Sequence, residues 1–345
     1  MKKNIFLIIF LLTYFLSFGQ DTKYDKNKNF TIVSYNVENL FDIYDDFEKK
    51  DDEFSPTSKK QWTEERFNEK INKISKVLFS INKNELPEII GLYEIENDYV
   101  LKALIKEKNL TKGNYNFVHE ESPDFRGIDV ALLFRADEFK YLSHKKIPIN
   151  FPFAKNTKTR DILYIKGIAS NTDTLHIFLN HWSSRRGGQI KSEAKRIFTA
   201  KLLREHVDSL QKINNNAKII IMGDFNDEPT NISINSELNA NNKRKNTTYK
   251  DLYNLLYDKE NIEDKGTLYY KKNWNMLDNL IVTQSLLNNK ESYSLNYNSG
   301  KIFHPEWICY KDKSGNFVPN RTYGGDNYYG GFSDHFPVYF ILTRK

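Results

Sequence analysis

The chain has 345 residues, a formal net charge of +6 at pH 7 and a single cysteine, Cys309. One cysteine excludes an intramolecular disulfide, so the folded chain depends on its hydrophobic core. The length suits one large domain or two at most, and the mildly basic charge is compatible with a polyanionic substrate without establishing one.

The N-terminus has the pattern of a signal peptide. Lys2 and Lys3 precede an apolar run from Ile5 to Phe18, and small or polar residues follow it. The run is short and interrupted by polar residues, which disfavours a membrane span; an N-terminal anchor is the alternative. We therefore expect a signal peptide at residues 1–19, a flexible leader at 20–29 and one domain at 30–345. The mature protein, with a charge of +4 once both lysines are lost, is expected in the periplasm or outside the cell, without a stable membrane anchor.

Alternating or continuous apolar residues predict strands along the whole of this domain. The predicted strands lie at residues 30–37, 88–96, 115–119, 128–135, 140–146, 163–169, 175–179, 219–222 and 280–282, with a last strand after His335.

Apolar residues at helical spacing predict four helices. The first begins after Thr63, a suitable N-cap, with Glu64 and Glu65 in its first turn. The others are expected at residues 99–108, 190–210 and 251–257.

Three further segments lack a regular pattern. Residues 42–60 are charged, and residues 231–250 are rich in Asn and Lys, so both are expected at the surface. Residues 301–331 are dense in aromatics and glycines and are expected to form a long structureless loop, which is more often functional than idle.

Strands outnumber helices, and several connections are too short for helical crossovers. This pattern favours a mixed α/β fold with two packed mixed sheets and helices on the outside, a four-layer sandwich, over a single doubly wound sheet.

The apolar strand at 219–222 stops at Gly223 and is followed at once by Asp224, Asn226, Asp227 and Glu228. Ligands commonly bind at the carboxyl ends of strands. Asp and Asn also satisfy turn geometry, so this stretch alone does not separate a binding site from a structural loop.

Similar polar residues occur at the ends or starts of other strands. A purely structural reading would have to hold independently at every one of these positions. The set contains carboxylates suited to a hard divalent cation, together with two histidines. It includes no glycine-rich P-loop and no Ser or Cys nucleophile elbow. The residues are Asn36, Glu94, Asp129, His181, Asp224, Asn226, Asp278, Asp334 and His335.

Arg185 and Arg186 stand before Gly187 and Gly188 and ahead of a predicted helix. Arginines beside a helix N-terminus suit phosphate binding. A solvated loop is the structural alternative for this pair.

Seven motifs, in this order, resemble the endonuclease/exonuclease/phosphatase superfamily with the DNase I-like fold. They are SYNVENLFD, GLYEIEN, RGIDVALLF, NHWSSRRGG, MGDFNDEP, MLDNLIV and SDHFPV. The Gly-Asp-x-Asn and Ser-Asp-His elements, with Glu94 upstream, are specific in combination. NVENLFD and NHWSSRRGG are most similar to the exported bacterial branch labelled endonuclease-like. The resemblance covers nearly the whole mature chain and implies metal-assisted hydrolysis of phosphoric esters.

The resemblance also implies a role for each residue. Glu94, helped by Asn36 and Asp334, would hold Mg²⁺, with Mn²⁺ or Ca²⁺ as alternatives. His335, oriented by Asp278, would be the general base or an electrostatic partner of the scissile phosphate.

The remaining residues would surround the phosphate. His181, oriented by Asp129, would bind or protonate a phosphate oxygen, although some relatives have Glu where Asp129 stands. Asn226 would donate to the transition state, and Asp224 would position water or metal. Whether Asp224 or His335 is the base stays open. Additional phosphate contacts are expected from Arg126, Arg185 and Arg186.

The leading hypothesis is therefore a secreted, monomeric, Mg²⁺-dependent phosphodiesterase that hydrolyses nucleic acid, DNA or RNA, with the aromatic residues of 301–331 available to stack bases. One alternative is a phosphoesterase for sphingomyelin, other phospholipid or inositol-phosphate headgroups. Another is a binding protein that keeps the fold without the reaction.

Overall fold

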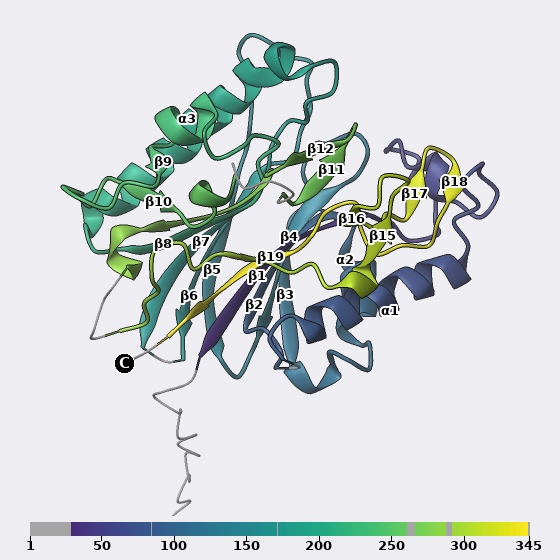
Figure 1. Ribbon diagram of the computed structural model, residues 1–345, viewed down its shortest axis with the longest axis horizontal. Helices are drawn as coiled ribbons and strands as arrows, with labels where there is room; N and C mark the ends of the chain where they lie inside the picture. The colour runs from purple at the N-terminus through teal and green to yellow at the C-terminus, as the bar shows by residue number, and fades with distance from the viewer. Residues whose placement is uncertain (1–28, 84, 171, 261–265, 288–291, 344–345) are drawn as a thin grey trace, which may run out of the picture.

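Two mixed β-sheets are stacked face to face with helices on both outer faces, which is the four-layer α/β arrangement expected from the sequence (Figure 1). The computed structural model describes residues 29–343 except 84, 171, 261–265 and 288–291. The expected signal peptide and nearly all of the expected leader lie outside these described residues. Among the helices described, none has the length and apolar character needed to cross a bilayer.

The first sheet consists of β1 (Phe30–Leu40), β2 (Ile89–Ile95), β3 (Tyr115–His119), β4 (Asp129–Arg135), β14 (Lys301–Ile302) and β19 (Val338–Leu342). Their order across the sheet is β14-β19-β1-β2-β4-β3. Strand β1 is parallel to β2 and antiparallel to β19, so the two ends of the domain meet at the centre of this sheet.

The second sheet consists of β5 (Phe139–Ile147), β6 (Ile162–Ala169), β7 (Asp173–His181), β8 (Lys218–Asp224), β9 (Ala240–Asn241), β10 (Leu252–Asn254) and β13 (Asp278–Thr283). Their order is β5-β6-β7-β8-β13-β10-β9. Strand β8 lies between parallel β7 and antiparallel β13, in the interior of the sheet.

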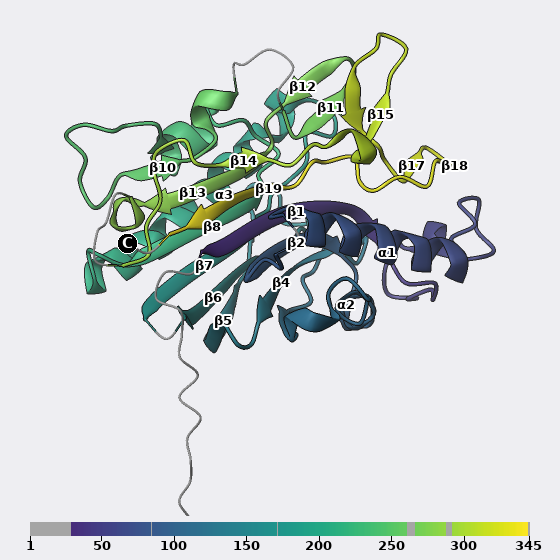
Figure 2. The same cartoon turned by 60° about the horizontal axis from the view of Figure 1, so that its bottom comes forward.

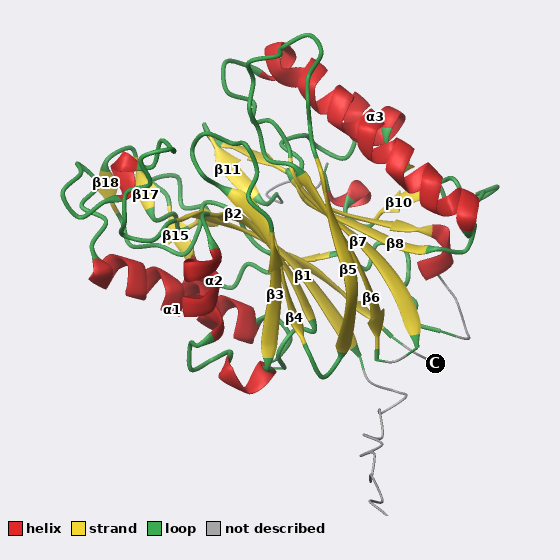
Figure 3. Ribbon diagram, turned by 180° about the vertical axis from the view of Figure 1, so that it is seen from behind, coloured by secondary structure: helices red, strands yellow, loops and turns green. Residues whose placement is uncertain are grey.

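Three helices cover the outer faces. Helices α1 (Glu64–Ser80) and α2 (Asp98–Ile105) lie on the first sheet, and α3 (Gln189–Ile213) lies on the second (Figures 2 and 3). Thr63 caps α1 as expected, because its side chain accepts a hydrogen bond from the Arg66 amide. Single turns of 3₁₀ or π helix occur at Asp52–Phe54, Thr111–Gly113, Ser233–Glu237, Tyr257–Lys259, Gln284–Leu286 and Glu306–Ile308.

Strand β8 shows how the layers are held together. Ile220 and Met222 are fully buried between the two sheets, whereas Ile219 and Ile221 are fully buried against α3. Successive side chains of a strand point to opposite faces, so one apolar run fills two cores. Burial of each such side chain stabilises the fold by roughly 1.5–3 kcal/mol.

Two sequence predictions about secondary structure were wrong. Residues 251–257 do not form a helix: Leu252, Tyr253 and Asn254 are all buried and form β10 between β9 and β13. Three consecutive buried residues fit a strand covered on both faces better than a one-sided helix.

The segment 301–331 is also not structureless. It contains β14 and four short strands that pair as two hairpins, β15 (Cys309–Lys311) with β16 (Phe317–Pro319), and β17 (Tyr323–Gly324) with β18 (Asn327–Tyr328). A third hairpin, β11 (Leu268–Tyr270) with β12 (Asn273–Asn275), precedes β13. These hairpins rise beyond one end of the two stacked sheets (Figure 2).

Candidate active site

The second sheet places three of the predicted residues in one row. In the strand register, His181 at the end of β7 is the partner of Asp224 at the end of β8, and Asp224 is also the partner of Asp278 at the start of β13. All three are buried. The cluster is therefore a direct result of strand pairing.

Gly223 makes this row possible. Its φ of +151° is rarely adopted by L side chains, and a Cβ there would lie 1.9 Å from the Asn180 carbonyl oxygen. Only glycine lets β7 and β8 approach this closely just before Asp224.

The first sheet contributes Asn36 from β1 and Glu94 from β2. The Asn36 Nδ2 atom is 3.1 Å from Asp224 Oδ2 and 3.5 Å from Glu94 Oε1, so one amide connects the two sheets. Glu94 has a φ of +66° and lies where the β1–β2 and β2–β4 registers shift. A strained conformation at a polar strand end is typical of a functional site. The Asn39 amide donates to Glu94 Oε2 at 2.8 Å and holds the carboxylate in place.

His335 lies between two carboxylates. Its Nδ1 atom is 2.7 Å from Asp278 Oδ2, and its Nε2 atom is 3.8 Å from Asp224 Oδ2. The His335 amide donates to Ser333 Oγ, which itself donates to the Asn36 carbonyl at 2.7 Å. These bonds fix the imidazole relative to β1.

The two histidines differ in charge. Burial opposes the charged form of His335, but Asp278 and Asp224 outweigh it and raise the pKa of this imidazole well above its ordinary value. Burial lowers the pKa of His181 well below its ordinary value, and the nearby cations Arg160, Arg126 and His335 add to the effect. His335 is therefore charged and His181 neutral near pH 7.

Asp224 titrates near neutral pH. Burial raises its pKa to about 7, and the negative charges of Asp278 and Glu94 act in the same direction, against the opposing charge of His335. A carboxylate that changes its protonation state near pH 7 is suited to general acid–base chemistry.

Glu94 and Asn36 are suited to holding a hard divalent cation. The Glu94 and Asp224 carboxylates flank the same Asn36 amide, and neither forms an ion pair with Lys or Arg in the described part of the chain. A cation bound through oxygen atoms would offset this excess negative charge. Asp334, the third expected ligand, instead has its Oδ2 atom 3.9 Å from Arg321, and no described contact joins it to Glu94.

The expected pairing of His181 with Asp129 is not present. His181 Nε2 lies 3.6 Å from Asp224 Oδ2 and 3.9 Å from Glu94 Oε1, and its Nδ1 atom is buried without a hydrogen-bond partner among the described residues. Asp129 contacts His119 and Ser122 instead. Asp129 lies on β4 of the first sheet, and His181 on β7 of the second, so the order of the motifs could not establish this contact.

The expected phosphate-binding arginines have different environments. Arg185 is held by several groups, since its Nε donates to the Asn226 carbonyl at 2.8 Å and its other nitrogens contact Asn231, Asn275 and Asp227. These bonds point to a positioning role for the Asn226 loop. Arg186 is exposed and has no described contact.

Arg126 remains close to the centre. It contributes to the low pKa of His181 and has its Nε atom 3.5 Å from Asp124 Oδ1. Asn226 itself donates through Nδ2 to the Trp182 carbonyl at 3.2 Å, next to His181.

Sequence reasoning missed Arg160. This residue is buried, its guanidinium is 3.0 Å from Asp124 Oδ2, and it donates to the Trp182 carbonyl at 2.6 Å. Its charge acts on both His181 and Glu94. Arg160 stands in a polar stretch before β6, and nothing in that stretch distinguishes it from a solvated loop residue.

The sequence comparison decides the family. The model of the Endonuclease/Exonuclease/phosphatase family matches residues 31–344. The chain belongs to this family. It is accordingly a phosphoesterase of the DNase I-like fold, and the resemblance drawn from the seven motifs is confirmed. No curated protein sequence gives a significant match.

Proteins with solved structures of similar fold include the following three. D. rerio TDP2 complexed with a single-strand DNA product is 14% identical, with 92% of this chain and 100% of that chain covered and a TM-score of 0.53. The mannosyl-6-phosphatase of Bacteroides thetaiotaomicron is 15% identical, with 91% of this chain and 99% of that chain covered and a TM-score of 0.55. The human Nocturnin catalytic domain with bound sulfate is 14% identical, with 92% of this chain and 95% of that chain covered and a TM-score of 0.52. At these identities the likeness concerns the fold alone.

Proposed function

We propose that this protein is an exported, Mg²⁺-dependent phosphodiesterase that hydrolyses nucleic acid, with DNA as its first substrate. The observation that carries the proposal is the position of Asp224. Its buried carboxylate faces His181, His335 and Asn36, three groups that come from both sheets and from the last segment of the chain. Such a convergence of ionisable groups with shifted pKa values is typical of a catalytic centre.

Asp224 is the proposed general base. Its pKa of about 7 lets it accept a proton from the attacking water near neutral pH. His335 is charged in the same range, so we assign it to binding the scissile phosphate rather than to removing the proton. Asp278 keeps the imidazole oriented and charged through its 2.7 Å contact.

The other groups bind the phosphate. Glu94 and Asn36 would hold Mg²⁺, which when bound polarises a phosphoryl oxygen and offsets developing negative charge. Asn226 and neutral His181 would donate hydrogen bonds to phosphoryl oxygens. Arg126 and Arg160 add positive charge beside His181.

A tyrosine-lined cavity supports a nucleic-acid substrate. Its volume is about 600 Å³, and its lining includes three tyrosines, Tyr269, Tyr310 and Tyr329, together with the acidic Asp312. Arg321 also lines it and lies 3.9 Å from Asp334, the neighbour of the proposed phosphate-binding His335. Aromatic side chains beside a basic group suit the stacking of unpaired bases next to their phosphates.

The test is a substrate panel with plasmid DNA, single-stranded DNA and RNA, each incubated with and without EDTA. We expect EDTA-sensitive cleavage of DNA that is restored by added Mg²⁺. Absence of metal-dependent cleavage of both DNA and RNA would overturn the proposal. Because a protein of this fold is a mannosyl-6-phosphatase, the panel includes sugar phosphates, inositol phosphates and sphingomyelin. Hydrolysis of one of these alone would keep the site and change the substrate.

Export is tested separately. In a bacterial host, we expect the protein in the periplasm or medium with an N-terminus near Gln20, as determined by intact mass. A cytoplasmic protein that retains Met1 would contradict the proposed signal peptide.

A further inference from the structure

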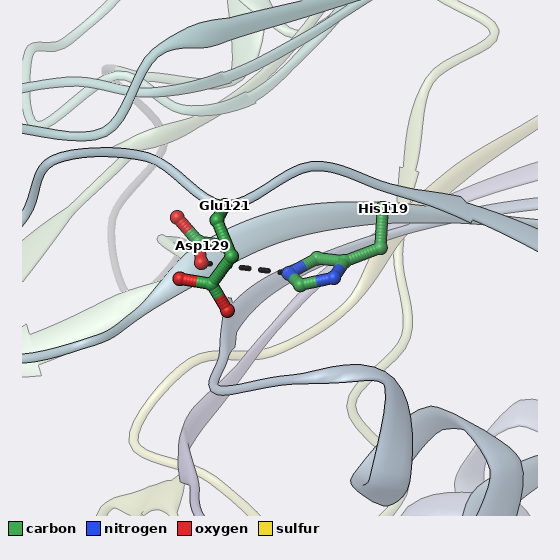
Figure 4. A group of neighbouring side chains, drawn as sticks. All are labelled: His119, Glu121 and Asp129. Atoms are coloured by element: carbon green, nitrogen blue, oxygen red, sulfur yellow. Dashed lines mark ion pairs between the residues drawn. The ribbon is translucent and has the colours of Figure 1, made fainter. Parts of the chain in front are cut away.

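Three metal-ligating side chains gather away from Asp224 and Glu94, where β3 ends and β4 begins. His119 is the last residue of β3, Asp129 is the first of β4, and Glu121 is in the loop between them. One ligand atom from each lies within 4.8 Å of the other two (Figure 4). We propose that this cluster binds a divalent transition-metal ion, with Zn²⁺ as the best match, and that the ion holds the loop at residues 120–128 in place.

Two of these ligand atoms are buried and form an ion pair only with each other in the described part of the chain. They are His119 Nε2 and Asp129 Oδ2. The Asp129 side chain is 1% exposed and that of His119 is 5% exposed. This pair depends on a proton at Nε2, and a bound metal ion would take the place of that proton and contact both atoms.

The spacing of the two atoms matches metal ligation. His119 Nε2 and Asp129 Oδ2 are 3.4 Å apart. Two ligand atoms that are each bonded to a tetrahedral zinc at about 2.0–2.2 Å lie roughly 3.4 Å from one another. These two side chains therefore need no rearrangement. Glu121 is 56% exposed but paired with Lys49, so its carboxylate has to shift from that ammonium to cover the remaining distance.

Neighbouring groups orient both buried ligands. His119 Nδ1 is 3.1 Å from Asp98 Oδ1, and this contact would hold the ring in place while an ion replaced the proton between Nε2 and Asp129. The other oxygen of Asp129 accepts from the Ser122 amide at 2.9 Å and from the Ser122 hydroxyl. Carboxylate–histidine–metal arrangements of this kind are typical of zinc sites. The imidazole favours a transition metal over Mg²⁺ or Ca²⁺, which prefer oxygen ligands alone.

The cluster is linked to the candidate active site through its loop. Residues 120–128 connect Glu121 to Asp129 and carry Asp124, whose carboxylate pairs with buried Arg160 at 3.0 Å. Arg160 in turn donates to the Trp182 carbonyl, beside His181. An ion that joins Glu121 to β3 and β4 would restrict the movement of this loop.

Lys49 competes for the same carboxylate. Its Nζ atom is 3.0 Å from Glu121 Oε2, so ion binding has to displace this ammonium or share the carboxylate with it. Removing the ammonium should therefore strengthen ion binding, whereas removing a ligand should weaken it.

The experiment measures Zn²⁺ binding by calorimetry on purified, metal-stripped protein that carries Glu94→Gln. That change weakens the proposed catalytic ion site, so the readout does not depend on activity. We expect one equivalent of Zn²⁺, with affinity lowered at least about tenfold by His119→Gln. The matched control is His144→Gln, since His144 is a nearby, partly exposed imidazole paired with Glu120 at 2.8 Å. It should leave binding unchanged.

Two changes at or near the surface keep the test valid if His119→Gln does not fold. Glu121→Gln should weaken Zn²⁺ binding, and Lys49→Gln should strengthen it. Co²⁺ in place of Zn²⁺ should show the visible absorption of a low-coordinate site in the Glu94→Gln protein and lose it in the Glu121→Gln double variant. Unchanged Zn²⁺ stoichiometry and affinity in the Glu121→Gln variant would overturn the proposal.

Discussion

Asp224 and Asp278 are direct partners in the antiparallel ladder of β8 and β13, and both carboxylates face the imidazole of His335. Two buried acids beside one base keep the imidazole charged, and burial, helped by repulsion between the two acids, raises the pKa of Asp224. The pairing of two strands therefore sets the protonation states on which the proposed reaction depends.

Replacing His335 with asparagine should abolish most of the phosphodiesterase activity. The variant removes the charged group assigned to the scissile phosphate, and we expect kcat to fall by about 10²–10³. The measurement is steady-state cleavage of the best substrate of the panel at saturating Mg²⁺.

His206→Gln is the control for this change. His206 lies on α3, on the outer face of the second sheet, and its substitution should leave kcat within about twofold of the unmodified protein. Full activity in the His335→Asn variant would show that the site has been assigned wrongly.

Asp278→Asn should move the pH–activity profile to lower pH. The Asp278 charge raises the pKa values of both His335 and Asp224, so its removal lowers both. The rise in activity should then occur at lower pH, because Asp224 loses its proton at lower pH. The decline in activity should also occur at lower pH, because His335 likewise loses its proton at lower pH. The measurement is kcat/KM between pH 5 and about 10. Asp208→Asn on α3 is the control, and a profile that stays in place or moves upward in Asp278→Asn would contradict the assigned charges.

Much of the fold could be predicted because its signals are local. The apolar run before Gly223, the spacing from Phe67 to Ile81 and the Thr63 cap each depend on residues close in sequence, and the structure confirms the elements they predicted. The motif order likewise identified the polar strand ends of both sheets.

Contacts between distant segments could not be predicted in this way. The Asp129 partner proved to be His119 on the adjacent strand, because antiparallel pairing of β3 with β4 brings these ends together. Arg160 carries no local signal at all, and its role depends on segments far away in sequence. The catalytic roles of the residues that do meet at Asp224 stay predictions.

Gly223→Ala should destabilise the protein strongly. The added Cβ would meet the Asn180 carbonyl oxygen at 1.9 Å, a rigid backbone atom between two central strands. We expect the free energy of unfolding to fall by more than about 3 kcal/mol, since overpacking adds to backbone strain. Urea denaturation followed by circular dichroism provides the measurement.

Gly187→Ala separates these two effects. Gly187 also has a positive φ, +82°, but a Cβ there would meet nothing within 4 Å. This variant should lose only the strain, about 1–2 kcal/mol. Equal losses in the two variants would rule out steric contact with Asn180 as the cause.

Lys70→Met should loosen the segment that leads to His335. Lys70 is buried on α1, and its ammonium donates to the Thr322 hydroxyl at 2.5 Å and to the Phe332 carbonyl at 2.8 Å. Buried Glu38 accepts a hydrogen bond from the Thr322 amide at 2.6 Å, and the charge of Lys70 acts on the same carboxylate. The variant therefore also leaves Glu38 without its nearby positive charge. We expect a loss of about 3 kcal/mol in the free energy of unfolding and faster hydrogen exchange at residues 322–335.

The control is Lys102→Met, which breaks an exposed 3.6 Å ion pair with Asp98 on α2 and should cost less than about 1 kcal/mol. If Lys70→Met costs no more than Lys102→Met, the buried ammonium does not anchor this segment to α1.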